Sequence, residues 1–131
     1  MSNHFTEVLL PMHIKLQGLY KRVCGDRRDG DTVYCLKCTD IHYLMGGDIY
    51  YCLSKLSMAK MIIIPLTIDD SSPEAQKRSL WGMVNWSLWS MQVYDTGDVF
   101  IRLRNSLNYS FDCKTLTEAI LRALCSQEGM E

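Results

Sequence analysis

The clearest pattern of apolar and polar positions lies between residues 89 and 103. Apolar side chains occupy alternate positions on both sides of the turn-forming segment Asp95-Thr96-Gly97-Asp98. This period of two predicts a β-hairpin with one apolar face, which needs a cover. The apolar positions are Trp89, Met91 and Val93 on one strand and Val99, Ile101 and Leu103 on the other.

A helical period follows near the C-terminus and predicts that cover. Thr115 and Glu118 stand at the spacing of a capping box, and Gly129 follows the last turn. An apolar stripe at i, i+3, i+4, i+7 and i+8 then predicts a helix that lies on the hairpin. The stripe consists of Leu116, Ala119, Ile120, Ala123 and Leu124.

A shorter helix is predicted from Pro73 to about Trp81. Ser72 can cap it, Pro73 suits the first helical position, and Gly82 is the expected end. Residues 65–72 read as a connection.

The N-terminal half predicts one short helix and then strands. The helix runs from about Met12 to Gln17 and is closed by Gly18. Turn-forming residues between apolar runs then predict two hairpins and a separate buried strand. The expected strands are Leu19–Cys24 with Thr32–Cys38, Ile41–Leu44 with Ile49–Leu53, and Met61–Ile64.

Together these elements predict an α+β fold. Short antiparallel strands form the N-terminal half, and a helix-hairpin-helix unit packs on them as a second layer. A chain of 131 residues fits one domain, or two closely packed subdomains. In the second case residues 1–68 are mainly β and residues 69–131 are α-β-β-α.

Composition narrows the classes of function. Fourteen basic residues against fifteen acidic ones give a net charge of −1, so no overall field attracts nucleic acid or anionic lipid. Residues 1–7 lack the pattern of a secretory signal, and no apolar run approaches a membrane span. We therefore expect a cytoplasmic protein with no membrane contact, in which the six cysteines are not a disulfide framework.

Potential metal ligands gather in a nineteen-residue window that contains Cys24, Cys35, Cys38 and His42. A zinc knuckle needs Cys-x-x-Cys at the tight end of a hairpin, whereas residues three apart on a strand point to opposite faces. We therefore favour the interpretation that the cysteines are small buried hydrophobes, and expect no cofactor. A zinc-stabilised module, with nucleic-acid binding as its function, is the alternative.

Catalytic patterns are weak. Asp95-Thr96-Gly97 matches the active-site triplet of aspartic proteases, but Asp98 follows where those enzymes have a small residue. A hairpin turn explains the triplet better, and no glycine-rich phosphate loop is present. We expect a protein that is not an enzyme.

Two features favour binding to a protein. Trp81, Trp86 and Trp89 fall within nine residues, and an exposed tryptophan is a natural contact anchor. Arg27 and Arg28 lie in the loop of the first predicted hairpin, although neighbouring aspartates offset their charge. These five residues are the candidate binding residues.

Part of the chain resembles small uncharacterised proteins of bacteriophages and prophages. The resemblance lies in Ile64-Pro65-Leu66-Thr67-Ile68-Asp69, in Ser79-Leu80-Trp81-Gly82-Met83, and in the ending from Leu116 to Gly129. It covers about the C-terminal half and implies an accessory protein in the cytoplasm of a bacterial host. Many such proteins bind and block a host or defence factor, so the resemblance implies an inhibitor that acts by protein recognition.

Overall fold

The computed structural model describes residues 4–25, 30–37, 39–45, 48–49 and 61–129. The N-terminal part contains the π-helix η1 (Phe5–Leu9), α1 (Leu10–Lys15), α2 (Gln17–Cys24), β1 (Thr32–Cys35), β2 (Asp40–Met45), β3 (Asp48–Ile49) and β4 (Met61–Ile63). The C-terminal part contains α3 (Pro73–Arg78), α4 (Leu80–Met83), β5 (Trp89–Val93), β6 (Val99–Leu103), β7 (Ser110–Cys113) and α5 (Leu116–Gln127). The chain is therefore α+β.

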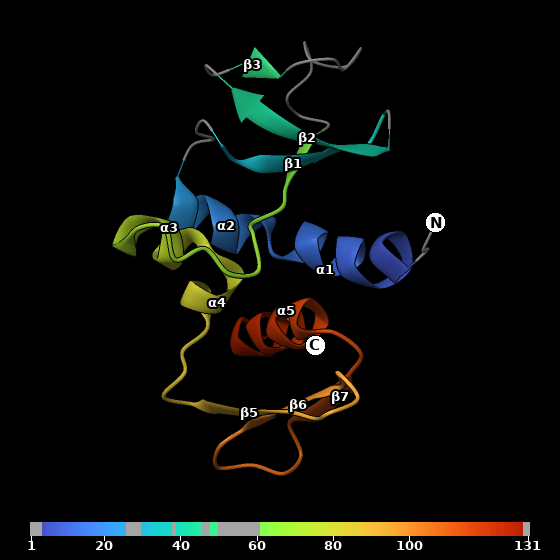
Figure 1. The fold of residues 1–131 in the computed structure, drawn as a ribbon, viewed down its shortest axis with the longest axis vertical. Coiled ribbons are helices and arrows are strands. Elements are labelled where there is room, and N and C mark those ends of the chain that lie inside the picture. Colours follow the sequence, from blue (N-terminus) through green and yellow to red (C-terminus); the bar gives the residue numbers. More distant parts are fainter. Residues whose placement is uncertain (1–3, 26–29, 38, 46–47, 50–60, 130–131) are drawn as a thin grey trace.

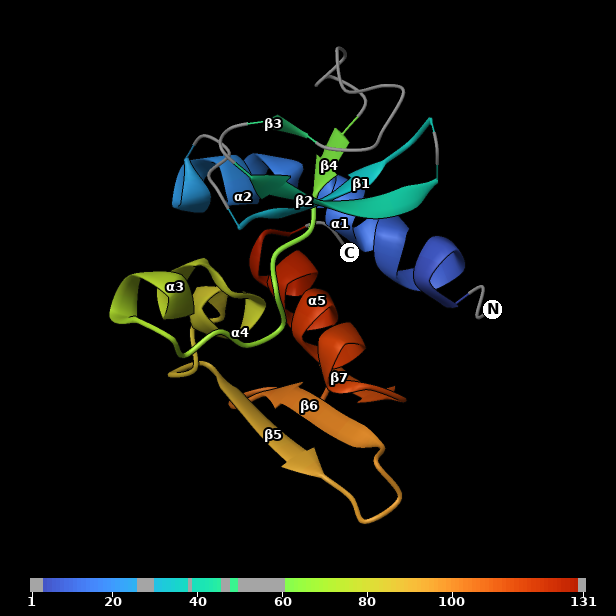
Figure 2. The same cartoon turned by 45° about the horizontal axis from the view of Figure 1, so that its top comes forward.

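The strands form two separate antiparallel sheets with the helices between them. One sheet has the order β3-β2-β1-β4 and the other β5-β6-β7. Figure 1 shows α1 and α2 next to the first sheet and α5 next to the second, and Figure 2 shows α5 crossing the second sheet. Helix α5 contacts β6 and β7 on one side and α1 and α4 on the other.

A single main core joins the two ends of the chain. Leu16 and Tyr20 from the N-terminal helices pack in the same cluster as Leu80, Ile101 and Leu124. A smaller cluster, formed by Leu10, Tyr34 and Ile64, connects α1 to the first sheet. Residues of the N-terminal helical region therefore take part in both apolar clusters, the main core and the smaller cluster at the first sheet.

The predicted strand Leu19–Cys24 is wrong, because these residues belong to α2. Leu16, Leu19, Tyr20 and Cys24 are all buried, and their spacing is that of one helix face. The helical region also begins earlier than predicted, at Phe5, and continues past Gly18. Its end is at Gly25, whose φ of +70° is a conformation that favours glycine.

The first predicted hairpin is wrong as a consequence, since β1 has another partner. Strand β1 pairs with β2 along one edge, where Thr32 lies opposite Tyr43 and Cys35 opposite Asp40. Along its other edge β1 pairs with β4. The pairing of β2 with β3 confirms the second hairpin where the structure describes it. Positions 50–53 of that hairpin lie outside the described residues. Strand β4 confirms the run from Met61, one residue shorter than predicted.

The hairpin of residues 89–103 is confirmed, with Trp89 opposite Leu103 and Val93 opposite Val99. Residues 95–97 form its turn, and Gly97 has a φ of +90°. The sequence analysis missed β7, which pairs with β6 and makes a three-stranded sheet. Only Phe111 and Cys113 alternate in this short strand, which is a weak signal beside its polar neighbours.

The helix predicted from Pro73 to Trp81 is divided at Ser79. Ser72 caps α3 as predicted, because its side chain accepts a hydrogen bond from the amide of Ala75 (3.0 Å). Ser79 is extended and caps α4 through a bond from the amide of Gly82 (3.3 Å). Gly82 therefore does not end the helix as predicted. A Cβ there would lie 1.9 Å from the carbonyl oxygen of Gln76, so glycine permits the close approach of α3 and α4.

Helix α5 is confirmed with the predicted start. The hydroxyl of Thr115 accepts a hydrogen bond from the amide of Glu118 (3.2 Å). Along the helix Ala119, Ile120 and Leu124 are fully buried. The stripe inferred from the sequence is therefore core.

We predict that Ile120→Ala lowers the free energy of unfolding by about 2–5 kcal/mol, because the fully buried side chain leaves a cavity. Urea denaturation of both proteins measures the loss. The control Leu107→Ala, at a side chain that is 75% exposed, should change stability by less than about 0.5 kcal/mol. A loss well under about 1 kcal/mol for Ile120→Ala would contradict the core assignment.

Candidate recognition site

Trp81 and Trp86 form a pair at the end of α4. Their ring centroids are 4.4 Å apart, with 34° between the ring planes. The indole Nε1 of Trp86 donates a hydrogen bond to the carbonyl oxygen of Trp81 (2.8 Å). Both residues are half-buried, so the pair is fixed in orientation while part of it faces solvent.

The turn after α4 positions the second ring. Val84 is buried and extended, which ends the helix. The side-chain oxygen of Asn85 then accepts hydrogen bonds from the amide and hydroxyl of Ser87, at 3.3 and 2.6 Å. This local Asx turn is a conformation that asparagine favours, and it places Trp86 against Trp81.

Helix α5 holds the same turn from its C-terminal end. The side-chain oxygen of Gln127 accepts a hydrogen bond from the amide of Asn85 (2.8 Å). The amide nitrogen of the same side chain donates to the carbonyl of Met83 at 3.4 Å. One glutamine therefore satisfies the last carbonyl of α4 and an amide of the turn that follows it.

The connection before α3 runs along the other side of α4. The amide of Trp81 donates to the carbonyl of Thr67 (2.9 Å), and the hydroxyls of Thr67 and Thr117 lie 2.6 Å apart. The next residue, Ile68, is 50% exposed. We call the region of Ile68, Trp81 and Trp86 the tryptophan surface. Ile68 was not predicted as a site residue, because the sequence does not show that Leu66 and Thr67 bond to α4.

Trp89 does not belong to this surface. Its side chain is only 2% exposed, and its ring stacks on that of Phe111 with centroids 6.4 Å apart. Strand β5 begins at Trp89, so Trp86 lies outside the strand. Arg27 and Arg28, the other candidate binding residues, lie outside the described residues.

The described members of the predicted metal-ligand set lie on three different elements. Cys24 lies on α2, where its thiol approaches the carbonyl oxygen of Arg78 at 3.9 Å. Cys35 ends β1, and His42 lies on the neighbouring strand β2. Within the described ranges no three His, Cys, Asp or Glu side chains form a group that could hold a metal ion. Cys24, Cys35 and His42 therefore do not form such a group.

In the structure a turn follows Cys35. Strand β1 ends at Cys35, and the amide of Thr39 donates to the carbonyl of Cys35 (2.8 Å) across a turn. Strand alternation therefore does not separate the two cysteines. Cys38 itself lies outside the described residues, so a metal site that includes it stays a prediction; the set predicted from the sequence is Cys24, Cys35, Cys38 and His42.

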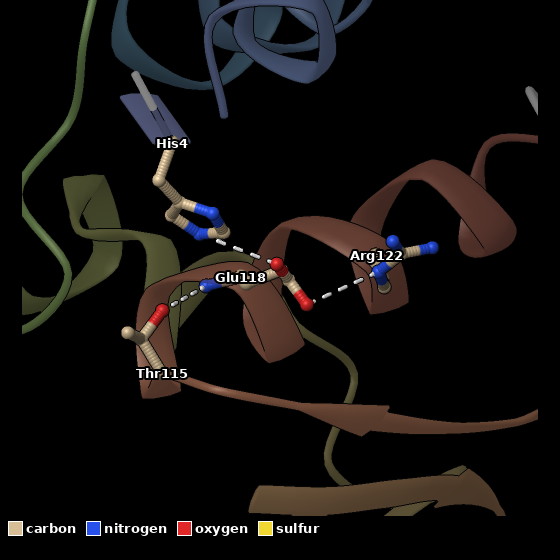
Figure 3. A network of polar contacts seen from close by, with 4 residues as sticks. All are labelled: His4, Thr115, Glu118 and Arg122. Carbon is tan, nitrogen blue, oxygen red and sulfur yellow. Dashed lines mark hydrogen bonds and ion pairs between the residues drawn. The ribbon is translucent and has the colours of Figure 1, made fainter. Parts of the chain in front are cut away.

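A second polar cluster surrounds the carboxylate of Glu118, which is 8% exposed (Figure 3). His4 Nε2 lies 3.3 Å from Glu118 Oε1, and Arg122 Nε lies 3.6 Å from Oε2. Burial and a hydrogen bond with Glu118 raise the pKa of the Cys113 thiol to about 12. That thiol stays protonated at neutral pH and is a poor nucleophile. The cluster therefore joins the N-terminus, α5 and β7 rather than activating a cysteine.

His13 is a buried histidine that is uncharged at neutral pH. It is 1% exposed, and its Nδ1 lies 3.1 Å from the hydroxyl of Tyr20. Burial lowers the pKa of His13 to about 4 and raises the pKa of Tyr20 above its usual range. At neutral pH the tyrosine hydroxyl can therefore donate to an uncharged imidazole.

Comparison with known proteins finds no matching family model, no matching curated protein and no matching solved structure. In the part of the chain that the structure describes, no helix has the length and hydropathy needed to cross a membrane.

We predict that the low pKa of His13 makes the protein less stable as the pH falls from about 6.5 to about 4. In this window the unfolded chain binds a proton at His13 that the folded protein does not bind. Between pH 7 and pH 4.5 the wild type should lose about 2–3 kcal/mol more than His13→Gln, measured by urea denaturation. Carboxyl groups titrate in both proteins, so parallel stability profiles would contradict the assignment.

Proposed function

We propose that this chain is a non-catalytic accessory protein of phage type that acts by binding a protein partner through the tryptophan surface. We further propose that the partner is a host or defence factor that this binding inhibits.

The observation that carries the proposal is the fixed, partly buried pair of Trp81 and Trp86, together with the exposed side chain of Ile68, which follows the Thr67 carbonyl that bonds to Trp81. Tryptophan is enriched among the residues that dominate binding energy in protein interfaces. Because the contact between the two tilted rings and the hydrogen bond from Trp86 Nε1 already orient them, binding orders fewer side chains. A preformed apolar surface of this kind suits the binding of a protein partner.

The charges beside the surface favour a protein over nucleic acid. Asp69 and Asp70 follow Ile68 directly. Hydrogen bonds from Ser71 lower the pKa of the Asp69 carboxyl, so this group is ionised at neutral pH. Carboxylates repel phosphate groups, and nucleic-acid binding instead requires clustered Lys and Arg side chains. No observation of the described residues favours the zinc-stabilised, nucleic-acid-binding alternative.

The phage-type assignment is supported by the position of the segments that carry the resemblance. Residues 64–69 and 79–83 supply Ile68 and Trp81, and residues 116–129 contain the helix α5, which bonds to both segments. The resemblance thus includes two of the three residues of the tryptophan surface, while Trp86 lies outside it.

We predict that Ile68→Glu abolishes partner binding, because a carboxylate placed at an apolar contact must lose water without gaining a counter-charge. The tagged protein is used to capture partners from a bacterial lysate, and the bound protein is quantified by mass spectrometry. Capture should fall by at least about tenfold.

The matched control is Leu107→Glu, which introduces the same charge at an exposed apolar side chain in the segment between β6 and β7. This variant should capture as much partner as the wild type, and circular dichroism confirms that both variants fold. Equal capture by Ile68→Glu and the wild type, or equal losses in both variants, would contradict recognition through the tryptophan surface.

A further inference from the structure

The outer edge of the first sheet is covered by a side chain. The amide of Ile63 in β4 donates a hydrogen bond to the side-chain oxygen of Gln17 (3.1 Å), and the side-chain nitrogen of Gln17 donates to the carbonyl of Ile63 (2.9 Å). Gln17 thus occupies backbone groups to which another strand would otherwise bind. The second sheet differs. In the described part of the chain β5 has β6 as its one neighbouring strand, and Figure 2 shows β5 at the outer margin of the sheet.

The margin of β5 presents backbone groups that β6 does not use. The amide of Tyr94 donates to the carbonyl of Asp98 across the hairpin, so these two residues are a hydrogen-bonded pair. Such pairs alternate along an antiparallel ladder, so the odd-numbered residues 89–93 direct their amides and carbonyls away from β6. At one end of this row the carbonyl of Trp89 accepts a hydrogen bond from Arg104 Nε (2.9 Å). Within the described residues the rest of the row is open to another strand.

This open edge carries no charge. Charged side chains and proline protect most exposed edge strands, and residues 85–94 contain neither. Apolar side chains are instead exposed at the two ends of β5, where Leu88 precedes the strand and Val93 and Tyr94 close it. Two such strands can approach without repulsion between their own charges. Arg102 lies one strand further in, so its positions in two copies would be about 14 Å or more apart, beyond the screening length of about 8 Å.

We infer that β5 pairs with β5 of a second copy of this chain, antiparallel and about a two-fold axis at Met91. In this register Met91 lies opposite Met91 of the second copy, and Trp89 lies opposite Val93. Both pairs use the backbone groups that face away from β6. The exposed side chains at the strand ends also match, since Leu88 lies opposite Tyr94. The pairing joins the two second sheets into one continuous sheet and closes at the dimer, because each copy uses this edge once.

The position of the axis follows from the side chains. With the axis at Met91, Ser90 lies opposite Gln92, so a polar residue meets a polar one and every apolar residue of the strand meets an apolar one. An axis at Ser90 would place Leu88 opposite Gln92. An axis at Gln92 would place Tyr94 opposite Ser90. The residues of this edge are not those of the tryptophan surface, so self-pairing does not rest on the proposed function.

Sedimentation velocity of the 131-residue chain at increasing concentration measures the self-association. The contact is one short strand pair, so we expect a reversible dimer with a Kd of about 10–100 µM. Val93→Pro removes an amide that points away from β6, a position where an edge strand tolerates proline, and should weaken the dimer by at least about tenfold. The control Val93→Thr keeps the amide and the shape of the side chain and should change the Kd by less than about threefold. Circular dichroism confirms that both variants fold.

A cysteine at the axis tests the register without removing a hydrogen bond. In Met91→Cys the two Cα atoms of the dimer are about 5.5 Å apart, a distance that a disulfide bridges. Oxidation by copper phenanthroline in air should therefore link this variant into a covalent dimer. The matched control is Gln92→Cys, whose Cα atoms would be about 8 Å apart, beyond the reach of a disulfide. Gln92 is more exposed than Met91, so random collisions would link the control more readily. Wild-type protein gives the background from the native cysteines.

Three results would overturn the inference. A monomer at every concentration up to about ten times the expected Kd would mean that this edge receives a strand of another protein or none. Dimerisation of a folded Val93→Pro variant with an unchanged Kd would exclude pairing through the backbone of β5. Linkage of Gln92→Cys to the same extent as Met91→Cys would exclude an axis at Met91.

Discussion

The burial of helix α5 on two sides is the constraint on which the rest of the structure depends. Seven of its twelve residues are buried, from Glu118 to Cys125, which is more than one face of a helix. A cover is therefore needed on both sides, and β6 and β7 supply one while α1 and α4 supply the other. The contacts of Glu118 with His4 and Arg122 add a polar connection at the helix start (Figure 3). Because α1 comes from the N-terminal half and β6, β7 and α4 from the C-terminal half, residues from both halves of the chain meet around α5.

The same helix also shapes the surface proposed for recognition. Thr117, in its first turn, bonds to Thr67 and so holds the segment that presents Ile68. Gln127, in its last turn, bonds to the turn between Trp81 and Trp86. Both contacts are made by polar side chains at the edges of an otherwise apolar stripe. These hydrogen bonds restrain the backbone of the proposed contact surface, which reduces the entropy lost on binding.

The elements predicted correctly are those with a strong local signal in the sequence. The capping residues Ser72 and Thr115 and the alternation of Trp89, Met91 and Val93 belong to this group. The helix α2 was mistaken for a strand because Leu19, Tyr20 and Val23 suit either structure, and only the packing of Leu16 and Tyr20 in the core decides between them. Of the candidate site, Trp81 and Trp86 were named from the sequence as candidate binding residues, but their pairing was not predicted. Ile68 was not named, since its place depends on the bonds of Leu66 and Thr67 to the distant helix α4.

Native-state hydrogen exchange tests the central claim, that α5 joins both halves of the chain in one cooperative core. The informative backbone amides are those of Tyr20 in α2, Ile101 in β6 and Leu121 in α5, all fully buried residues. If the core is one unit, all three exchange only through global unfolding, with the same free energy and the same dependence on denaturant. Exchange of Tyr20 through an opening of clearly lower free energy than that of Leu121 would contradict the claim.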